Sequence, residues 1–383
     1  MNVFSKKLIN FVRATYKKSD FIPLHAPVFN KKDKDYVVDA IDSTFVSTVG
    51  AYVKKFEDQV ASYVGTRYAI ATVNGTSALH AVLMASNVER NDEVITQSLT
   101  FVATCNAIKY CGANPVFVDV SRETMGMSPD SLKEFLHIYA ELDDDGLCRN
   151  KETGSIIRAC VPMHCLGHAM EVDTIKEICT AYNIKLIEDS AESLGSLYKG
   201  KNTGSYGESA ILSFNGNKII TCGGGGMVLT NSKSIEKKVR HITTTAKDTH
   251  DWEFSHNEVG YNYRLPNINA ALGFSQMQKL DDYLYNKRIL AEKYKDFFLD
   301  DEHIFFVEPE NSKSNYWFNA FFSKDKKERD SILAYTNKHG VMTRPFWTPM
   351  HNLPMYNLCQ KTSMENTNWL YEHLVCIPSG VNL

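Results

Sequence analysis

The chain has 383 residues, a formal net charge of −3, 43% hydrophobic residues and 23% charged residues. This composition is typical of a globular protein with one large or two medium domains, and it excludes collagenous, disordered and low-complexity classes. The small net charge provides no field to hold a polyanion, so neither nucleic acid nor an acidic membrane surface is expected as a partner.

The first 18 residues carry basic side chains between their apolar ones, and no run of 18 apolar residues occurs in the chain. They therefore predict neither a signal peptide nor a membrane span. Phe4, Leu8 and Val12 recur at a helical period, which predicts an amphipathic helix packed on its own protein or on a partner subunit. The nine cysteines form no CxxC pair and indicate no disulfide or zinc framework, so we expect a reducing cytoplasmic location.

From about residue 67, short β-branched runs alternate with longer helical patterns. This alternation predicts an α/β fold with a mostly parallel central sheet covered by helices. The pattern changes near residue 255, so we expect residues 1–255 to form a large domain with the N-terminal helices and 256–383 a smaller α+β domain. One long helix is predicted over residues 268–298 of the smaller domain.

Two strand ends in the predicted large domain carry polar residues where open α/β sheets bind ligands. Asp189 follows the apolar run 184–187, although it could simply cap a helix. Residues 74–80 pass through Gly75 into a helix whose N-terminus could seat a phosphate, with Thr76 and Ser77 adding hydroxyl donors. Taken alone, an ordinary helix start explains this second motif equally well.

Lys218 lies between a short strand and the glycine run 223–226, with apolar and small neighbours. An amine in such a crevice can form a Schiff base. Taken alone, Lys218 could equally be an ordinary solvated lysine in a loop. A phosphate seat, a carboxylate at a strand end and this lysine together predict a site for pyridoxal 5'-phosphate (PLP). Asp189 would keep the pyridine nitrogen protonated, and Phe101 would stack on the ring or belong to the core.

The strings NGTSALHA, TFVATCNAI, EDSAESLGS, SFNGNK and GYNYRLPNINAALG resemble the nucleotide-sugar aminotransferases of the DegT/StrS type. The resemblance extends from about residue 20 to the tail and implies the PLP-dependent transferase fold type I, that of aspartate aminotransferase. It also implies a homodimer with shared active sites. The residues it assigns are Lys218 as the Schiff-base lysine, Asp189 as the pyridine-nitrogen partner, Phe101 as the stacking ring, Gly75, Thr76, Ser77 and Ser213 around the phosphate, Glu192 near the phenolic oxygen, and Asn262 as the residue sent to the neighbouring subunit's phosphate.

The strings FIPLHAP, DSTFVSTVG, VPMHCLGH and RPFWTPMH look most like the LegC-like branch of this family. This likeness implies transfer of an amino group from glutamate to C4 of a UDP-2-acetamido-2,6-dideoxy-4-keto-hexose, in bacillosamine or nonulosonic acid and surface-glycan synthesis. The alternatives are an enzyme like GDP-perosamine synthase or a 3-keto-sugar aminotransferase. A sugar dehydratase of this fold would carry His in place of Lys218, and a regulatory relative would lack Lys218 or Asp189.

Four further residues are candidates for substrate contact. Arg264 and Arg344 could hold a diphosphate through bidentate contacts or serve as ordinary ion-pair residues. His164 has the spacing to His168 of a helical metal pair, but Pro162 and Gly167 place both in a loop, which favours substrate contact or local hydrogen bonding over zinc. His351 is a weaker candidate of the same kind, and no metal is implied.

Overall fold

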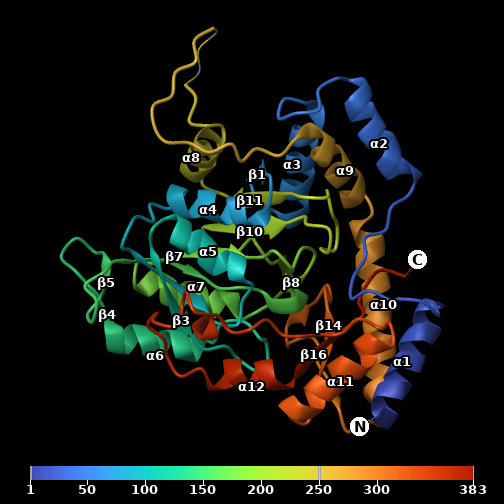
Figure 1. Ribbon diagram of the computed structural model, residues 1–383. Helices are drawn as coiled ribbons and strands as arrows, with labels where there is room; N and C mark the ends of the chain where they lie inside the picture. Colours follow the sequence, from blue (N-terminus) through green and yellow to red (C-terminus); the bar gives the residue numbers. More distant parts are fainter. Residues whose placement is uncertain (1, 249, 251, 383) are drawn as a thin grey trace.

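The computed structural model describes residues 2–248, 250 and 252–382 (Figure 1). The helices are α1 (Asn2–Tyr16), α2 (Lys31–Asp42), α3 (Ala51–Val64), α4 (Gly75–Ala85), α5 (Val102–Tyr110), α6 (Pro129–Tyr139), α7 (Val172–Ala181), α8 (Lys233–Thr243), α9 (Asn267–Met277), α10 (Leu280–Phe298), α11 (Lys326–Lys338) and α12 (Glu365–His373). The strands are β1 (Tyr68–Thr72), β2 (Glu93–Gln97), β3 (Asn114–Val118), β4 (Ala140–Leu142), β5 (Cys148–Asn150), β6 (Ile157–Val161), β7 (Lys185–Asp189), β8 (Leu197–Tyr198), β9 (Lys201–Asn202), β10 (Ser209–Ser213), β11 (Gly226–Thr230), β12 (Ile304–Phe305), β13 (Ser312–Lys313), β14 (Asn319–Phe322), β15 (Arg344–Pro345) and β16 (Leu374–Ile377).

The central sheet has seven strands in the order β1-β11-β10-β7-β6-β2-β3. Neighbours from β10 to β3 pair in parallel, while β11 runs antiparallel to both β1 and β10. The prediction of a mostly parallel sheet is therefore confirmed. Because β1 and β10 both oppose β11, the carboxyl ends of β1, β10, β7 and β2 meet at one edge of the sheet, where ligands bind in such folds.

Helices cover both faces of this sheet. On one face α4, α5 and α8 pack over Ile70, Val94 and Ile211. On the other face α3 and α9 cover the β1 end, and α6 and α7 cover the β3 end. Ala69 and Ala71 face the opposite side from Ile70, as the two-residue period of a strand requires. The sheet is thus buried on both sides, which explains its nearly continuous apolar strands.

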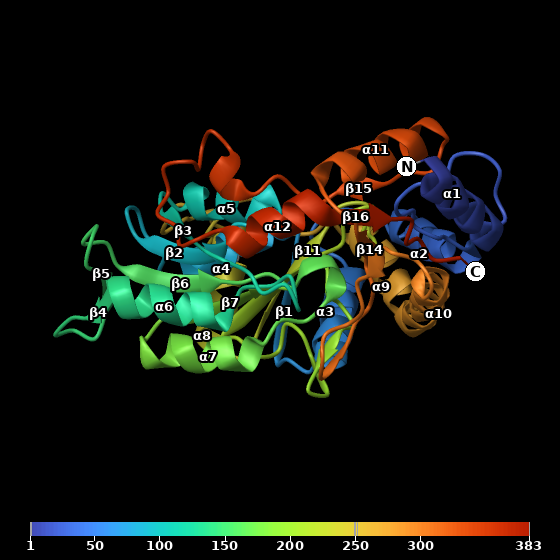
Figure 2. The same cartoon turned by 90° about the horizontal axis from the view of Figure 1, so that it is seen from below.

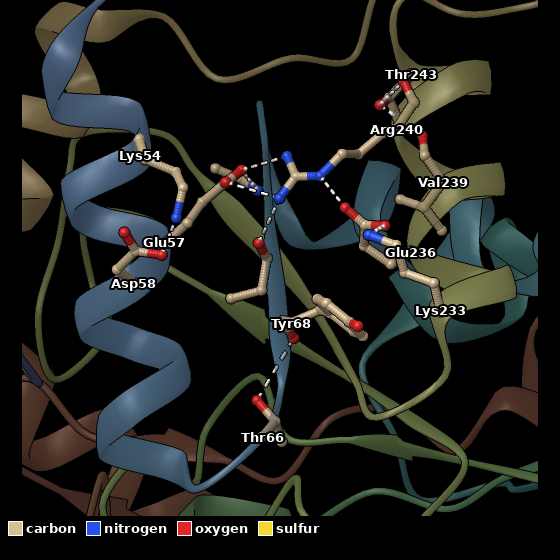
Figure 3. A network of polar contacts seen from close by, with 12 residues as sticks. Lys54, Glu57, Asp58, Thr66, Tyr68, Lys233, Glu236, Val239, Arg240 and Thr243 are labelled. Atoms are coloured by element: carbon tan, nitrogen blue, oxygen red, sulfur yellow. Dashed lines mark hydrogen bonds and ion pairs between the residues drawn. The ribbon is translucent and has the colours of Figure 1, made fainter.

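An ion pair between Arg240 and Glu57, here called the clasp, joins α8 on one face of the sheet to α3 on the other across the free edge of β1 (Figure 3). The Arg240 guanidinium of α8 donates to both carboxylate oxygens of Glu57 in α3, at 3.2 and 2.9 Å, and to the carbonyl of Ala69. Glu57 also accepts the N–H of Ala71 at 2.9 Å. Backbone groups that an edge strand would leave unpaired are satisfied by this ion pair.

The C-terminal strands form a separate antiparallel sheet in the order β12-β14-β16-β15. Helix α1 packs beside it: Leu8 and Val12 share one apolar cluster with Tyr294 of α10 and Ile332 of α11 (Figure 2). The expectation that the first residues form a helix packed on its own protein is confirmed. The domain division at residue 255 stays a prediction, although α1 packs with the C-terminal sheet and not with the large sheet to which we assigned it.

The prediction of one long helix over 268–298 is wrong, because α9 ends at Met277 and α10 begins at Leu280. Lys279 between them has φ −114° and ψ 2°, and its amine pairs with the buried Asp33. The break lets α9 pack on α2 and α3 while α10 joins the cluster around α1. No helix within the described part of the chain has the length and apolar character needed to cross a membrane.

Candidate active site

A pocket of about 290 Å³ opens at the carboxyl ends of the parallel strands of the central sheet. It brings together seven of the predicted cofactor residues, which are Gly75, Thr76, Phe101, Asp189, Glu192, Ser213 and Lys218. They come from the ends of β1, β2, β7 and β10 and from the turns that follow. The parallel strands therefore bring distant segments together, since Gly75 and Lys218 line one pocket although they lie 143 residues apart in the chain.

Asp189 is the last residue of β7, a strand held between β6 and β10. Its carboxylate is buried and accepts hydrogen bonds from the Thr104 hydroxyl at 2.8 Å and from the Ala191 N–H at 3.2 Å. Burial raises the pKa of Asp189, while the Thr104 hydrogen bond and the charge of Lys218 oppose that rise. A buried carboxylate with this environment is stabilised by a cationic partner inside the pocket.

Lys218 follows β10 in the turn at 214–221, where its N–H donates to the carbonyl of Asn215 at 3.0 Å. Its amine lies 3.2 Å from Glu192 Oε1, and Glu192 Oε2 accepts the N–H of Leu166 at 2.9 Å. Burial raises the pKa of Glu192 to about 7, although the Lys218 charge opposes it. The pocket therefore holds two carboxyl groups and one amine, an arrangement suited to proton transfer.

Helix α4 begins at the pocket. Asn74 caps it, because its side-chain oxygen accepts the N–H of Ser77 at 2.8 Å. A Cβ on Gly75 would lie 3.0 Å from the Ser213 Cβ, so the two segments approach as closely as a glycine allows. The first turn of α4 thus faces the pocket with its positive dipole end, next to the hydroxyl-bearing Thr76 and Ser213.

Two predicted cofactor contacts do not line this pocket in the described chain. Ser77 uses its N–H in the helix cap, and its side chain is buried. Asn262 is exposed and forms an isolated antiparallel bridge with Thr244. Its place outside its own chain's pocket agrees with the expectation that it serves a neighbouring subunit, and that role stays a prediction.

None of the four substrate candidates lines the pocket. His164 is fully buried, with Nε2 3.0 Å from Glu188 Oε2, so the expectation of substrate contact is wrong and local hydrogen bonding accounts for it. His168 is likewise buried, and its Nδ1 lies 2.9 Å from the Ser314 hydroxyl. The loop position predicted for both residues is correct, but the sequence does not reveal their polar partners, because these are distant in the chain.

The two arginines and His351 also lie elsewhere. Arg264 forms an isolated antiparallel backbone bridge with Thr72, and together with Arg240 it lines a separate pocket beside β1. Arg344 is exposed in β15, where it donates to the side chain of Asn337. His351 Nδ1 lies 2.7 Å from the Ser98 hydroxyl. None of the three lines the pocket of its own chain, and their contact with a substrate stays a prediction.

Two tryptophans also line the pocket. Trp347 lines the pocket with its ring 6.0 Å from that of Phe101, whose side chain is 49% exposed. Trp317 lies with its ring centroid 4.1 Å from the Lys218 amine. Thr104, the hydroxyl bound to Asp189, stands three residues after Phe101 in α5 and could have been found from that helical spacing. Trp317 could not, because no local pattern connects it to Lys218.

These residues fit PLP. The buried carboxylate of Asp189 suits a protonated pyridine nitrogen, the open face of Phe101 suits an aromatic ring, and the N-terminus of α4 suits a phosphate. Gly75 at the start of this helix approaches Ser213 closely, because a Cβ at Gly75 would lie 3.4 Å from the Ser213 Oγ. The amine of Lys218 reaches the same pocket, as a Schiff-base lysine must.

Comparison with known proteins agrees with this geometry. The family model for DegT/DnrJ/EryC1/StrS aminotransferases matches residues 27–383. The GDP-perosamine synthase of Escherichia coli O157:H7 is 35% identical over 364 residues, which cover 94% of this chain and 95% of the relative. Helicobacter pylori PseC, an aminotransferase involved in the biosynthesis of pseudoaminic acid, has a TM-score of 0.85 at 23% identity, over 95% of each chain.

The PLP form of Spr1654 from Streptococcus pneumoniae has a TM-score of 0.84 at 23% identity, over 95% of this chain and 94% of that one. At these identities the solved structures show the fold alone. With the mainly parallel sheet and its helical layers, they confirm the predicted PLP-dependent transferase fold type I.

Proposed function

Because this chain belongs to the DegT/DnrJ/EryC1/StrS aminotransferase family and is thus a PLP-dependent enzyme of the transaminase class, we propose that it aminates a nucleotide-linked keto sugar. The specific reaction we propose is transfer of the glutamate amino group to C4 of a UDP-2-acetamido-2,6-dideoxy-4-keto-hexose. The observation that carries the proposal is the meeting of the Lys218 amine and the buried Asp189 carboxylate in one pocket at the start of α4.

When bound, PLP supplies an electron sink for the pair left by a broken Cα–H bond. Asp189 holds a proton at the pyridine nitrogen, and Thr104 and Ala191 fix its carboxylate through their hydrogen bonds. The amine of Lys218 would hold the aldehyde carbon of PLP and, when free, would accept the proton from the donor's Cα. Glu192 lies 3.2 Å from that amine and can take up or return a proton there.

The nucleotide is the less constrained part of the proposal. The UDP-linked substrate rests on the likeness of four short strings to one branch of the family. A GDP-linked keto sugar is the second candidate, because the GDP-perosamine synthases of Escherichia coli O157:H7 and Vibrio cholerae are 35% and 32% identical to this chain. Both candidates require the same cofactor chemistry and differ in the groups that recognise the nucleotide.

A direct assay separates these candidates. The PLP-loaded enzyme is given glutamate and one of three compounds: the UDP-linked 4-keto sugar, a GDP-linked 4-keto-6-deoxyhexose, or a nucleotide-linked 3-keto sugar. Product mass identifies amination and kcat/KM ranks the compounds. We expect the UDP-linked compound to give the highest kcat/KM. A higher value for the GDP-linked compound would replace the proposed substrate by the second candidate, and turnover of the 3-keto sugar alone would overturn C4 amination.

We also propose a cytoplasmic homodimer with shared active sites. Trp252, Phe254 and Val259, between α8 and α9, are 76%, 82% and 81% exposed. The residues that the structure describes there extend away from the body of the molecule (Figure 1). Large apolar side chains gathered on an extended segment mark a protein interface. Asn262 follows this segment directly, so a second copy that covers it would bring Asn262 towards another chain's pocket.

A further inference from the structure

We infer that Trp317 holds the free amine of Lys218 in position, so that Trp317 is a positioning residue of this enzyme. The inference rests on the Schiff-base role proposed above for Lys218. During such a reaction the lysine is alternately bound and free, and its free amine must stay close to the reacting carbon. Proximity of this kind is a large part of catalytic rate enhancement.

Two groups hold the Lys218 amine in the structure. Glu192 Oε1 lies 3.2 Å away, and the ring centroid of Trp317 lies 4.1 Å away. The lysine side chain is only 13% exposed, so little water competes for the amine. Indole is the best aromatic partner for an ammonium group, and the attraction strengthens when the pair is desolvated. The Trp317 ring therefore fixes the end of an otherwise flexible side chain.

Trp317 is itself fixed by two contacts of its ring and two of its backbone. Its Nε1 donates to the carbonyl of Asn217 at 2.7 Å, which ties it to the residue next to Lys218. Its N–H donates to Asn315 Oδ1 at 2.7 Å, and its ring stacks on Phe318 with centroids 3.8 Å apart. Its carbonyl accepts from the Lys287 amine at 3.2 Å. The two backbone contacts fix the position of residue 317, and the Nε1 hydrogen bond fixes the orientation of its ring beside Lys218.

The support for Trp317 comes from the C-terminal part of the chain. Lys287 in α10 is fully buried and also donates to the carbonyl of Ser379, which follows β16. Lys218 belongs instead to a turn of the central sheet. The C-terminal helices and strands thus place the indole of Trp317 beside the amine of Lys218, which belongs to the large sheet. The position of Lys218 therefore depends on how these two parts of the chain pack together.

The test compares apoenzymes carrying Trp317→Leu, which removes the aromatic face, and Trp317→Phe, which keeps one. The rate of PLP capture is followed by visible absorbance in a stopped-flow instrument, and affinity for pyridoxamine phosphate (PMP) is measured by calorimetry. PMP has no aldehyde and forms no bond to Lys218. We expect the Leu variant to capture PLP about tenfold more slowly and the Phe variant within about threefold of wild type. PMP affinity should change less than about twofold in both.

Trp369→Leu, which removes an indole of α12 outside the pocket, is the matched control and should capture PLP at the wild-type rate. Capture by the Leu variant at the wild-type rate, or a parallel loss of PMP affinity, would overturn the inference. Borohydride trapping and peptide mapping of the wild-type enzyme separate this failure from that of the proposed function. A trapped adduct at another lysine would refute the role of Lys218 itself.

Discussion

At the scale of single residues, Asp189 and Glu192 show how one short segment supplies two carboxyl groups with different roles. Both are buried and both have raised pKa values, with burial as the main cause. Asp189 accepts from Thr104 and Ala191, whereas Glu192 accepts from Leu166 and faces the Lys218 amine. Their different partners predict different consequences when each is replaced.

Asp189→Asn should lower kcat of the aminotransferase reaction by about a hundredfold, because an amide cannot hold a proton at the pyridine nitrogen. The Asn oxygen can still accept from Thr104, so the melting temperature should stay near that of wild type. Steady-state kinetics with glutamate and the preferred keto sugar, together with thermal unfolding, provide the measurements. A kcat within about twofold of wild type would contradict the proposed pairing.

Glu192 predicts a pH dependence of apoenzyme stability. Its pKa is raised from an ordinary 4.5 to about 7, so between these values the folded chain keeps a proton that the unfolded chain releases. Stability from this group is therefore present at low pH and lost as pH rises through about 7.

Glu192→Gln removes this titration. We expect the unfolding free energy of wild type, relative to that of the variant, to fall by about 3 kcal/mol between pH 4.5 and 7.5. Wild type is then less stable relative to the variant at the higher pH. Urea denaturation at both values measures it. A difference that does not vary with pH would show that Glu192 has an ordinary pKa in the folded chain.

At the scale of elements, the ion pair between Arg240 and Glu57 explains how β1 is held beside the pocket. Arg240 of α8 and Glu57 of α3 lie on opposite faces and meet across the edge of β1 (Figure 3). Helix α4 begins three residues after β1 ends, so the position of this strand sets the position of the helix N-terminus at the pocket.

Arg240→Ala should destabilise the fold by about 2 kcal/mol, because it leaves the buried Glu57 carboxylate and the Ala69 carbonyl without their partner. Lys54→Ala is the control, since this residue of α3 forms an exposed pair with Asp58 and should cost less than about 0.5 kcal/mol. Chemical denaturation of both variants measures the two values. Equal small losses would show that the clasp contributes little.

At the scale of the whole molecule, the pocket of one chain contains Lys218 and the carboxylates of Asp189 and Glu192. Asn262 and the exposed side chains of the segment between α8 and α9 lie outside it. Residues of the C-terminal sheet pack with Trp317, and Lys287 of α10 donates to its carbonyl. A complete site therefore draws on the large sheet, on the C-terminal part of the chain and, as we propose, on a second copy.

Complementation tests the shared site. Lys218→Ala and Asn262→Asp should each be inactive alone, the first for lack of the amine and the second because its carboxylate repels the phosphate. Mixed dimers regain one site with both native residues, so co-expression should restore about a quarter of wild-type activity. Activity no higher than that of the separate variants would contradict sharing, as would sedimentation of the wild-type enzyme as a monomer.

From the order of the amino acids alone, the fold class, the amphipathic N-terminal helix and most of the pocket lining could be predicted. Strand ends and helix starts are local patterns, and parallel topology then brings Gly75, Asp189 and Lys218 to one edge. Three features are visible only in the folded chain, namely the break in the helix over 268–298, the pair of His164 with Glu188, and the approach of Trp317 to Lys218. Each of these depends on packing between segments distant in the chain, which leaves no local period or spacing in the sequence.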